Sequence, residues 1–237
     1  SRFYAEQVQA LFGQWAQVHS YSTGDRSVEG IVESDLYLLS TDAFEDAQEA
    51  RRYVPSDGQV VEIQLTYPKE VIQDLKRIPR GTRVLFVNAT RQMAREAITQ
   101  LEQLGVNQIG FEPYGPDSPV LEGLDIAVTP DEAGFVPPGM KKVINIGHRP
   151  CTPGTMIEAA IRLGLEGLLE EKQFQNYMKT MASGNYSFDE MFARSRKMES
   201  RFDILLEILD EGMVGVNEKG EVYACNQKAK EITGVNR

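Results

Sequence analysis

This chain has few of the side chains that metal sites, disulfide frameworks and acid–base active sites use. Its 237 residues include two cysteines and two histidines. Cys151 and Cys225 lie far apart in the sequence, and two cysteines alone define neither a disulfide framework nor a zinc site. Reduced thiols in a cytoplasmic protein are the simplest interpretation. We therefore expect neither a metal site nor a bound cofactor.

Common nucleotide-binding and catalytic motifs are absent as well. The sequence contains no GxxxxGK(S/T), GxSxG, HExxH or CxxC pattern, and no GxGxxG pattern follows a predicted strand. Each of these patterns fixes a phosphate-binding loop, a nucleophile or metal ligands in a defined local structure. No carboxylate pair stands out as a general acid and base. These absences favour a chain with no catalytic residues and no enzymatic activity.

Basic residues and long apolar runs are also scarce. The 25 Lys and Arg residues are outnumbered by 35 Asp and Glu, which gives a net charge of -10. An acidic surface repels phosphate backbones, which argues against nucleic-acid binding by this chain. No apolar run is long enough to span a membrane and no signal peptide opens the chain, so we expect a cytoplasmic protein without a membrane partner. The opening SRFYAEQ lacks methionine, which suggests part of a longer protein.

What the sequence does contain is an alternation of strand-like apolar runs and helical patterns, as far as about residue 165. The predicted strands are QVHSYS (17–22), DLYLLST (35–41), QVVEIQ (59–64), RVLFVNA (83–89), QIGFEPY (108–114), LDIAVT (124–129) and KVINIG (142–147). The predicted helices are 3–15, 42–54, 67–78, 90–105 and one that begins near Thr152. Thr90 is the expected cap of the helix 90–105, and Gly105 is its expected stop. Such alternation predicts an α/β fold with a mostly parallel sheet and right-handed crossovers.

The alternating region, residues 1–168, divides into two blocks and predicts two Rossmann-like (flavodoxin-like) lobes with parallel sheets. We expect lobe one to comprise about 1–80 plus 140–168 and lobe two about 81–139, with a ligand-binding cleft between them. Residues 169–205 then predict a helical linker, and from Phe188 to Leu209 seven residues, six of them apolar, recur at alternating steps of three and four. These residues are Phe188, Met191, Ser195, Met198, Phe202, Leu205 and Leu209. They indicate either a coiled coil that makes a homodimer or a helix packed on its own domain.

Residues 206–237 have a third pattern. MVGVN and VYACN predict two strands joined by the tight turn EKGE, and Asn226 is placed to cap the helix QKAKEITG. This order resembles the opening of a PAS domain. The resemblance covers about thirty residues and stops before the remaining PAS strands, so we expect an incomplete PAS domain.

Small polar side chains recur where predicted strands give way to helices or loops. In a parallel sheet such strand ends gather on one edge, where they would line a pocket for a small polar or carboxylate-bearing molecule. The candidate ligand-binding residues are Ser40, Thr41, Asn88, Thr90, Arg91, Thr129, Glu132, Gly147, His148, Arg149, Thr152 and Thr155.

The stretch NIGHRPCTPGT, residues 145–155, concentrates these candidates in one loop, for which three interpretations stay open. Thr152 followed by Pro153 is typical of a helix cap. The free N–H groups of a helix start, with Arg149 beside them, would instead bind an anion. Cys151 would be a nucleophile if its surroundings lowered its pKa.

The front of the chain resembles the N-terminal sensory domain of sigma-54-dependent transcriptional activators, the PrpR N-terminal type found in propionate-catabolism activators. The resemblance spans most of residues 1–170 and rests on the pattern and order of several segments. These are FYAEQVQALFG, ESDLYLLST, RVLFVNATRQMAREAITQLEQLGV, DIAVTPDE and KKVINIGHRPCTPGTMIEAAIRLGL. The order of sensory domain, linking helix and PAS domain is also that of the family.

The resemblance implies a signal-input module that binds a small-molecule effector, an organic acid or another anion, between its lobes. Arg91 and Arg149 are the candidate anion partners. In the family an AAA+ ATPase and a helix-turn-helix domain follow the PAS domain, so the full-length protein would act with sigma-54 RNA polymerase and DNA. Two other interpretations stay open: a small α/β enzyme acting on a carboxylated or phosphorylated substrate, and an inert dimerisation scaffold.

Overall fold

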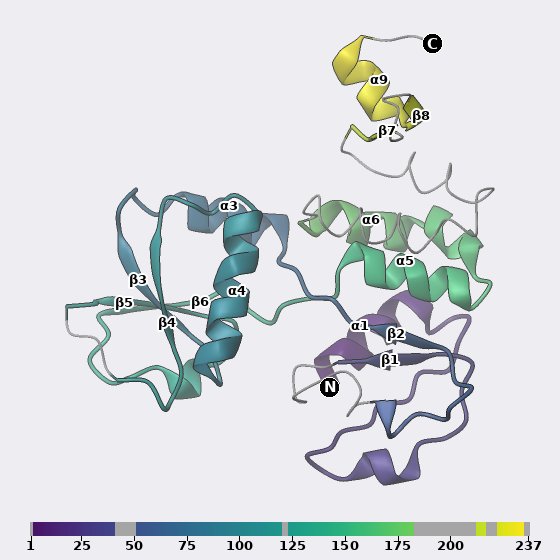
Figure 1. Ribbon diagram of the computed structural model, residues 1–237, viewed down its shortest axis with the longest axis horizontal. Coiled ribbons are helices and arrows are strands. Elements are labelled where there is room, and N and C mark those ends of the chain that lie inside the picture. The colour runs from purple at the N-terminus through teal and green to yellow at the C-terminus, as the bar shows by residue number, and fades with distance from the viewer. Residues whose placement is uncertain (1, 41–50, 120–122, 183–211, 217–221, 235–237) are drawn as a thin grey trace.

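The computed structural model describes residues 2–40, 51–119, 123–182, 212–216 and 222–234. It shows an α/β protein in which two bodies, here called the first lobe and the second lobe, lie side by side (Figure 1). None of the helices described in these ranges is both long and apolar enough to cross a membrane. The alternating pattern of the sequence therefore predicted the fold class correctly, since both lobes contain parallel strands.

The first lobe surrounds a small parallel sheet. Its elements are α1 (Arg2–Phe12), a 3-10 helix (Ser27–Gly30), β1 (Tyr37–Leu39), β2 (Val60–Glu62), α5 (Pro153–Arg162), a second 3-10 helix (Glu166–Glu170) and α6 (Lys172–Thr180). β1 pairs with β2 from Tyr37 opposite Val60 to Leu39 opposite Glu62. The buried core residues are Leu11, Phe12, Cys151, Met156, Ile157, Ala159, Ala160, Leu168, Leu169, Phe174 and Met178. This core thus joins the start of the chain to helices that follow the whole second lobe.

The second lobe contains a larger sheet. Its elements are α3 (Lys69–Lys76), β3 (Arg83–Val87), α4 (Arg91–Gln103), β4 (Gly110–Tyr114), β5 (Ile126–Thr129), a 3-10 helix (Ala133–Phe135) and β6 (Lys142–Asn145). The four strands are all parallel, in the order β4-β3-β5-β6. β4 therefore lies on one side of β3, whereas β5 and β6 lie on the other. The direction in which successive strands are added to the sheet reverses at β3.

The two faces of this sheet are covered differently. Helices α3 and α4 pack on one face, where Leu75, Ala97 and Leu101 meet the β3 side chains Val84 and Phe86. The other face buries Leu85, Val87, Tyr114, Leu124 and Ala127, packed by Val136 and Met140 from the loop between β5 and β6. Among the described residues, helices thus cover one face and loop residues the other. β3 is buried on both faces, which explains its continuous apolar run.

Two helix starts in these lobes follow from local sequence. Thr90 precedes α4 and its hydroxyl accepts a hydrogen bond from the Met93 N–H at 3.1 Å. Thr152 caps α5 in the same way, and Pro153 occupies the first helical turn. Gly105 ends α4 with a positive φ of 84°, a conformation that glycine adopts without a steric penalty. The caps read from the sequence are therefore confirmed.

Two extended segments, 63–68 and 146–152, connect the lobes, and together they are called the crossing here. They run antiparallel, with Leu65 opposite Cys151. The Thr66 N–H donates to the Pro150 carbonyl at 2.8 Å, and the Thr152 N–H donates to the Gln64 carbonyl at 2.7 Å. Because backbone bonds join the two segments to each other, the crossing is an ordered two-stranded connection.

The C-terminal segment forms a small unit of its own. β7 (Val214–Val216) and β8 (Val222–Cys225) are antiparallel, and α9 (Gln227–Thr233) follows them. The Asn226 Oδ1 accepts from the N–H of Ala229 at 2.9 Å and of Met213 at 2.8 Å, so it caps α9 and ties it to the hairpin. Both predicted strands, the cap and the helix are confirmed; the PAS interpretation stays a prediction. The heptad residues 188–209 lie outside the described residues.

Three details differ from the predictions. Residues 17–22 form irregular backbone rather than a strand, because no described strand pairs with them and none of their side chains is buried. β6 pairs with β5, so 142–145 belongs to the second lobe and not to lobe one, where the sequence pattern placed it. α3 likewise packs in the second-lobe core. Of the helix predicted over 42–54, residues 42–50 lie outside the described residues.

Candidate functional site

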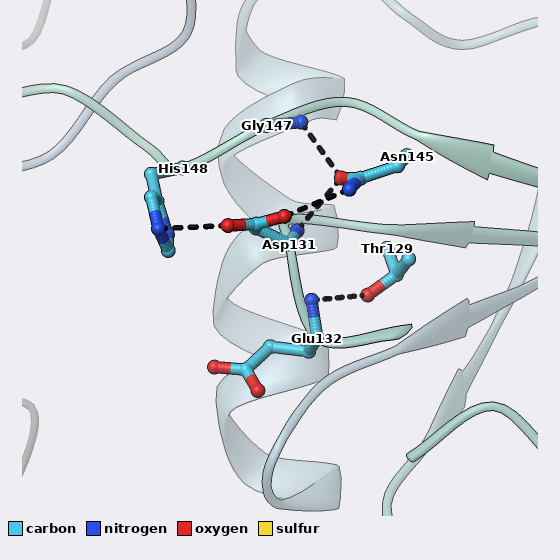
Figure 2. A network of polar contacts seen from close by, with 6 residues as sticks. All are labelled: Thr129, Asp131, Glu132, Asn145, Gly147 and His148. Carbon is cyan, nitrogen blue, oxygen red and sulfur yellow. Dashed lines mark hydrogen bonds and ion pairs between the residues drawn. The ribbon is translucent and has the colours of Figure 1, made fainter. Parts of the chain in front are cut away.

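A network of polar contacts lies where β5 and β6 end and the chain enters the crossing (Figure 2). Asp131 is its centre. The Asp131 carboxylate accepts from the Asn145 side-chain amide at 2.8 Å and contacts the His148 Nε2 at 2.8 Å through its other oxygen. The Asn145 Oδ1 in turn accepts from the backbone N–H of Asp131 and of Gly147, both at 2.9 Å. These bonds fix the Asn145 amide orientation, because its oxygen faces two donors and its nitrogen faces a carboxylate.

The sheet register explains why these residues meet. Asn145 lies opposite Thr129 in the β5–β6 pair, so the two strand ends are adjacent. The buried Thr129 hydroxyl accepts from the Glu132 N–H at 3.0 Å, which turns the chain directly after β5. Asp131 within this turn has a φ of 68°, a left-handed conformation that Asp adopts more readily than most residues. The turn therefore directs the Asp131 carboxylate toward Asn145, which ends β6, and toward His148.

The network is open to solvent and touches the first lobe. The His148 and Asp131 side chains are 48% and 43% exposed, so their contact contributes little to stability and leaves both groups accessible. The Phe3 ring of α1 lies 4.7 Å from the His148 ring, centroid to centroid. His148 is thus placed between a second-lobe carboxylate and a first-lobe aromatic ring.

Arg149, the next residue, is in a different environment. It is the least exposed arginine of the described residues, and no carboxylate of those residues lies within 4.0 Å of it. Its guanidinium is close enough to the fully buried Tyr67 to affect that hydroxyl. Burial raises the pKa of Tyr67, and the Arg149 charge opposes part of that rise. Tyr67 stays a neutral phenol that donates to the Ala97 carbonyl at 3.2 Å, so it brings no negative charge to Arg149.

The C-terminal half of the candidate loop is structural. The Thr155 hydroxyl accepts from the Gln64 N–H at 3.0 Å and lies 3.0 Å from the Thr152 hydroxyl, and both residues are buried. They anchor the crossing to α5. Cys151 is also buried, and burial raises the pKa of its thiol to about 12. A thiol with that pKa stays protonated at neutral pH, so Cys151 is not a reactive nucleophile.

The remaining candidates lie along other strand ends. Asn88, after β3, is buried and its Oδ1 accepts from the Ala89 N–H at 2.8 Å. Thr90 caps α4, and the exposed Arg91 begins it. The backbone of Gly115 covers this helix start so closely that a Cβ there would lie 2.4 Å from the Arg91 N. Ser40 follows β1, whereas Thr41 lies outside the described residues.

The structure thus joins Thr129, Glu132, Gly147 and His148 around Asp131 and Asn145, and places Arg149 beside them in the chain. The candidate set predicted from the sequence left out Asp131, Asn145, Phe3 and Tyr67. Asn145 could have been included, because it lies in a predicted strand and begins the candidate loop 145–155. Phe3 and Tyr67 carried no local signal, since their roles come from contacts across the crossing.

No metal site occurs among the described residues of this network. Among the described residues, no group of three His, Cys, Asp or Glu side chains is arranged to hold a metal ion. A shallow groove runs along α1 instead, lined by Arg2, Ala5, Glu6, Gln9, Ala10 and Val18, and it contains none of the candidate residues. Comparison with protein-family models, curated proteins and solved structures finds no match. The chemistry of these residues is therefore the main guide to function.

Proposed function

We propose that this chain is the signal-sensing region of a sigma-54-dependent transcriptional activator. In this proposal two Rossmann-like lobes bind a small anionic metabolite, such as an organic acid, beside the crossing. The change in lobe arrangement then passes through the linking helix and an incomplete PAS domain to ATPase and DNA-binding domains of the full-length protein, which works with sigma-54 RNA polymerase in the cytoplasm. The order of segments along the sequence supports this assignment.

The observation that carries the proposal is the environment of Arg149. Arg149 is partly buried where the two lobes join, and no described carboxylate neutralises its guanidinium. Partial burial of an unpaired cation is unfavourable unless an anion compensates it. A guanidinium also matches the planar, two-oxygen geometry of a carboxylate. A ligand carboxylate or phosphate at Arg149 would supply the missing charge.

Thermal denaturation with a panel of anions tests this proposal. Mono-, di- and tricarboxylates and inorganic phosphate are added at constant ionic strength, and a true ligand raises the melting temperature. Binding of a ligand to the native state at 100 times its Kd stabilises it by about 2.7 kcal/mol. We expect Arg149→Ala to abolish this shift. Arg95→Ala, which removes an exposed arginine from α4, is the matched control and retains the shift.

Two outcomes contradict the proposal. The absence of any shift across the panel removes the evidence for anion sensing, and a shift that survives Arg149→Ala assigns the anion to another site. Homodimerisation through the linking helix is a separate prediction. Light scattering on the chain cut at about residue 185 tests it, because a dimer that survives the cut does not depend on the heptad residues.

A further inference from the structure

We propose that Met181 and Ala182 form a third connection between the lobes, here called the tether. Through the tether, a change in the arrangement of the lobes moves the chain that follows residue 182. α6 belongs to the first lobe, because Phe174 and Met178 are buried in the first-lobe core. Four residues after Met178, Ala182 is buried in the second-lobe core beside Tyr67 and Ile72. At Ala182 the chain therefore lies in the second-lobe core, although α6, the helix just before it, is packed on the first lobe.

Three backbone and side-chain contacts hold the tether. The Ala182 N–H donates to the Tyr67 carbonyl at 2.8 Å, and the Ala182 carbonyl accepts from the Thr66 hydroxyl at 2.6 Å. Pro68 and Met181 face each other in an isolated antiparallel bridge. Thr66 and Ala182 are only 2% and 7% exposed. Because water cannot easily replace these partners, the two bonds to Ala182 resist local opening.

The tether is an added strand of the crossing. Thr66 donates through its backbone to Pro150 on one side and through its hydroxyl to Ala182 on the other. The Tyr177 hydroxyl of α6 also donates to the Cys151 carbonyl. Three segments, 63–68, 146–152 and 181–182, therefore lie side by side where the lobes join.

This arrangement has a mechanical consequence. Closure of two lobes is absorbed by φ and ψ changes in a few connecting residues. Here those residues are bonded to Ala182, so a change in lobe arrangement moves the start of the following chain or breaks its bonds. That a metabolite drives the movement rests on the proposed function, because a ligand shifts the arrangement only by its differential affinity. The tether itself rests on the contacts alone.

A test of the tether needs no ligand. Thr66→Val removes the hydroxyl that bonds to Ala182 with little change in volume, and Thr66→Ser keeps it. Spin labels at Lys172→Cys on the first lobe and Glu102→Cys on the second, both exposed positions, report the interlobe distance in a Cys225→Ser background. The buried Cys151 is not expected to take up label. We expect Thr66→Val to broaden the distance distribution and Thr66→Ser to match the parent.

Thr180→Val is the matched control. Among the described residues, the Thr180 hydroxyl bonds only to the Asn176 and Tyr177 carbonyls of its own helix, so its loss leaves the tether intact. Amide hydrogen exchange of Ala182 is the second readout. Loss of the Thr66 bond should speed that exchange by about tenfold, the effect of one buried hydrogen bond. If Thr66→Val does not fold, Ala182→Pro removes the N–H that bonds to Tyr67 and replaces it in the distance measurement.

The outcomes separate the two proposals. Identical distance distributions and Ala182 exchange in Thr66→Val and Thr66→Ser would overturn the tether. If Thr180→Val broadens the distance distribution as much as Thr66→Val does, the broadening comes from the last turn of α6 and not from the tether. Broadening in Thr66→Val alone supports the tether even if no anion in the panel binds, so failure of the sensing proposal remains distinguishable.

Discussion

Both lobes contain parallel strands and helices, but they differ in which parts of the chain form their cores. Apart from Ala182, the second lobe draws its buried core from a continuous stretch, Tyr67 to Val128, around a four-stranded sheet. The first lobe has two strands, and its core joins α1 to α5 and α6 from beyond the second lobe. The second lobe is thus an insertion that can fold from local pairings, whereas the first lobe forms only when distant segments meet.

This difference predicts an asymmetry in stability between the lobes. Unfolding of the second lobe would leave the halves of the first lobe joined by a loop of roughly 90 residues, between Glu62 and Pro153. Closing such a loop costs on the order of 4 kcal/mol, taken as (3/2)RT ln n. The first lobe therefore depends on the second, and the reverse dependence is weaker.

The largest expected effect comes from core truncations in each lobe. Phe86→Ala and Phe174→Ala each remove a buried ring and should lower the free energy of unfolding by about 3–5 kcal/mol. Hydrogen exchange of β3 and α5 peptides reports each lobe. We expect Phe86→Ala to speed exchange in both lobes and Phe174→Ala mainly in α5. If both variants speed exchange equally in the β3 and α5 peptides, the two lobes unfold as one unit.

A smaller effect compares the helix caps of the two lobes. Thr90→Ala in the second lobe removes one side-chain bond and should cost about 1 kcal/mol. Thr152→Ala should cost more, up to about 2 kcal/mol, because the Thr152 hydroxyl also lies against the Thr155 hydroxyl that anchors the crossing. Urea denaturation measures both. Serine at either position is the control, and a smaller loss for Thr152→Ala than for Thr90→Ala would contradict the anchoring role.

The smallest effect concerns the contact between the lobes at His148. Because His148 and Asp131 are nearly half exposed, His148→Gln should change the free energy of unfolding by less than about 1 kcal/mol. The difference between parent and variant should shrink further in 1 M salt, which screens exposed charges. A loss of several kcal/mol in the same denaturation experiment would mean that this contact holds the lobes together.

Local sequence signals predicted much of the second lobe. The buried run of β3 and the cap and glycine stop of α4 were evident, because each depends on neighbouring residues. Residues 17–22 show the limit of such signals, since a strand pattern becomes a strand only where a partner strand is available. The membership of β6 in the second lobe was missed because its own residues do not show which strand it pairs with.

The candidate site likewise combines residues that local sequence signals indicated with contacts that they did not. Thr129, Glu132, Gly147 and His148 were predicted from their place at strand ends, and the structure connects them through Asp131 and Asn145. The sequence indicated Thr90 and Thr152 as helix caps, and their cap bonds are present. The anchoring role of Thr155 became clear only when its bond to the Gln64 N–H was known.

The sequence by itself determined the α/β class, most strand and helix positions and the capping residues, because periodicity and capping act over a few residues. Only the tertiary structure decided that β6 pairs with β5, that Phe3 meets His148 and that Ala182 joins the second-lobe core. These contacts link residues far apart in the chain. Their formation depends on how whole elements pack, which no short stretch of sequence encodes.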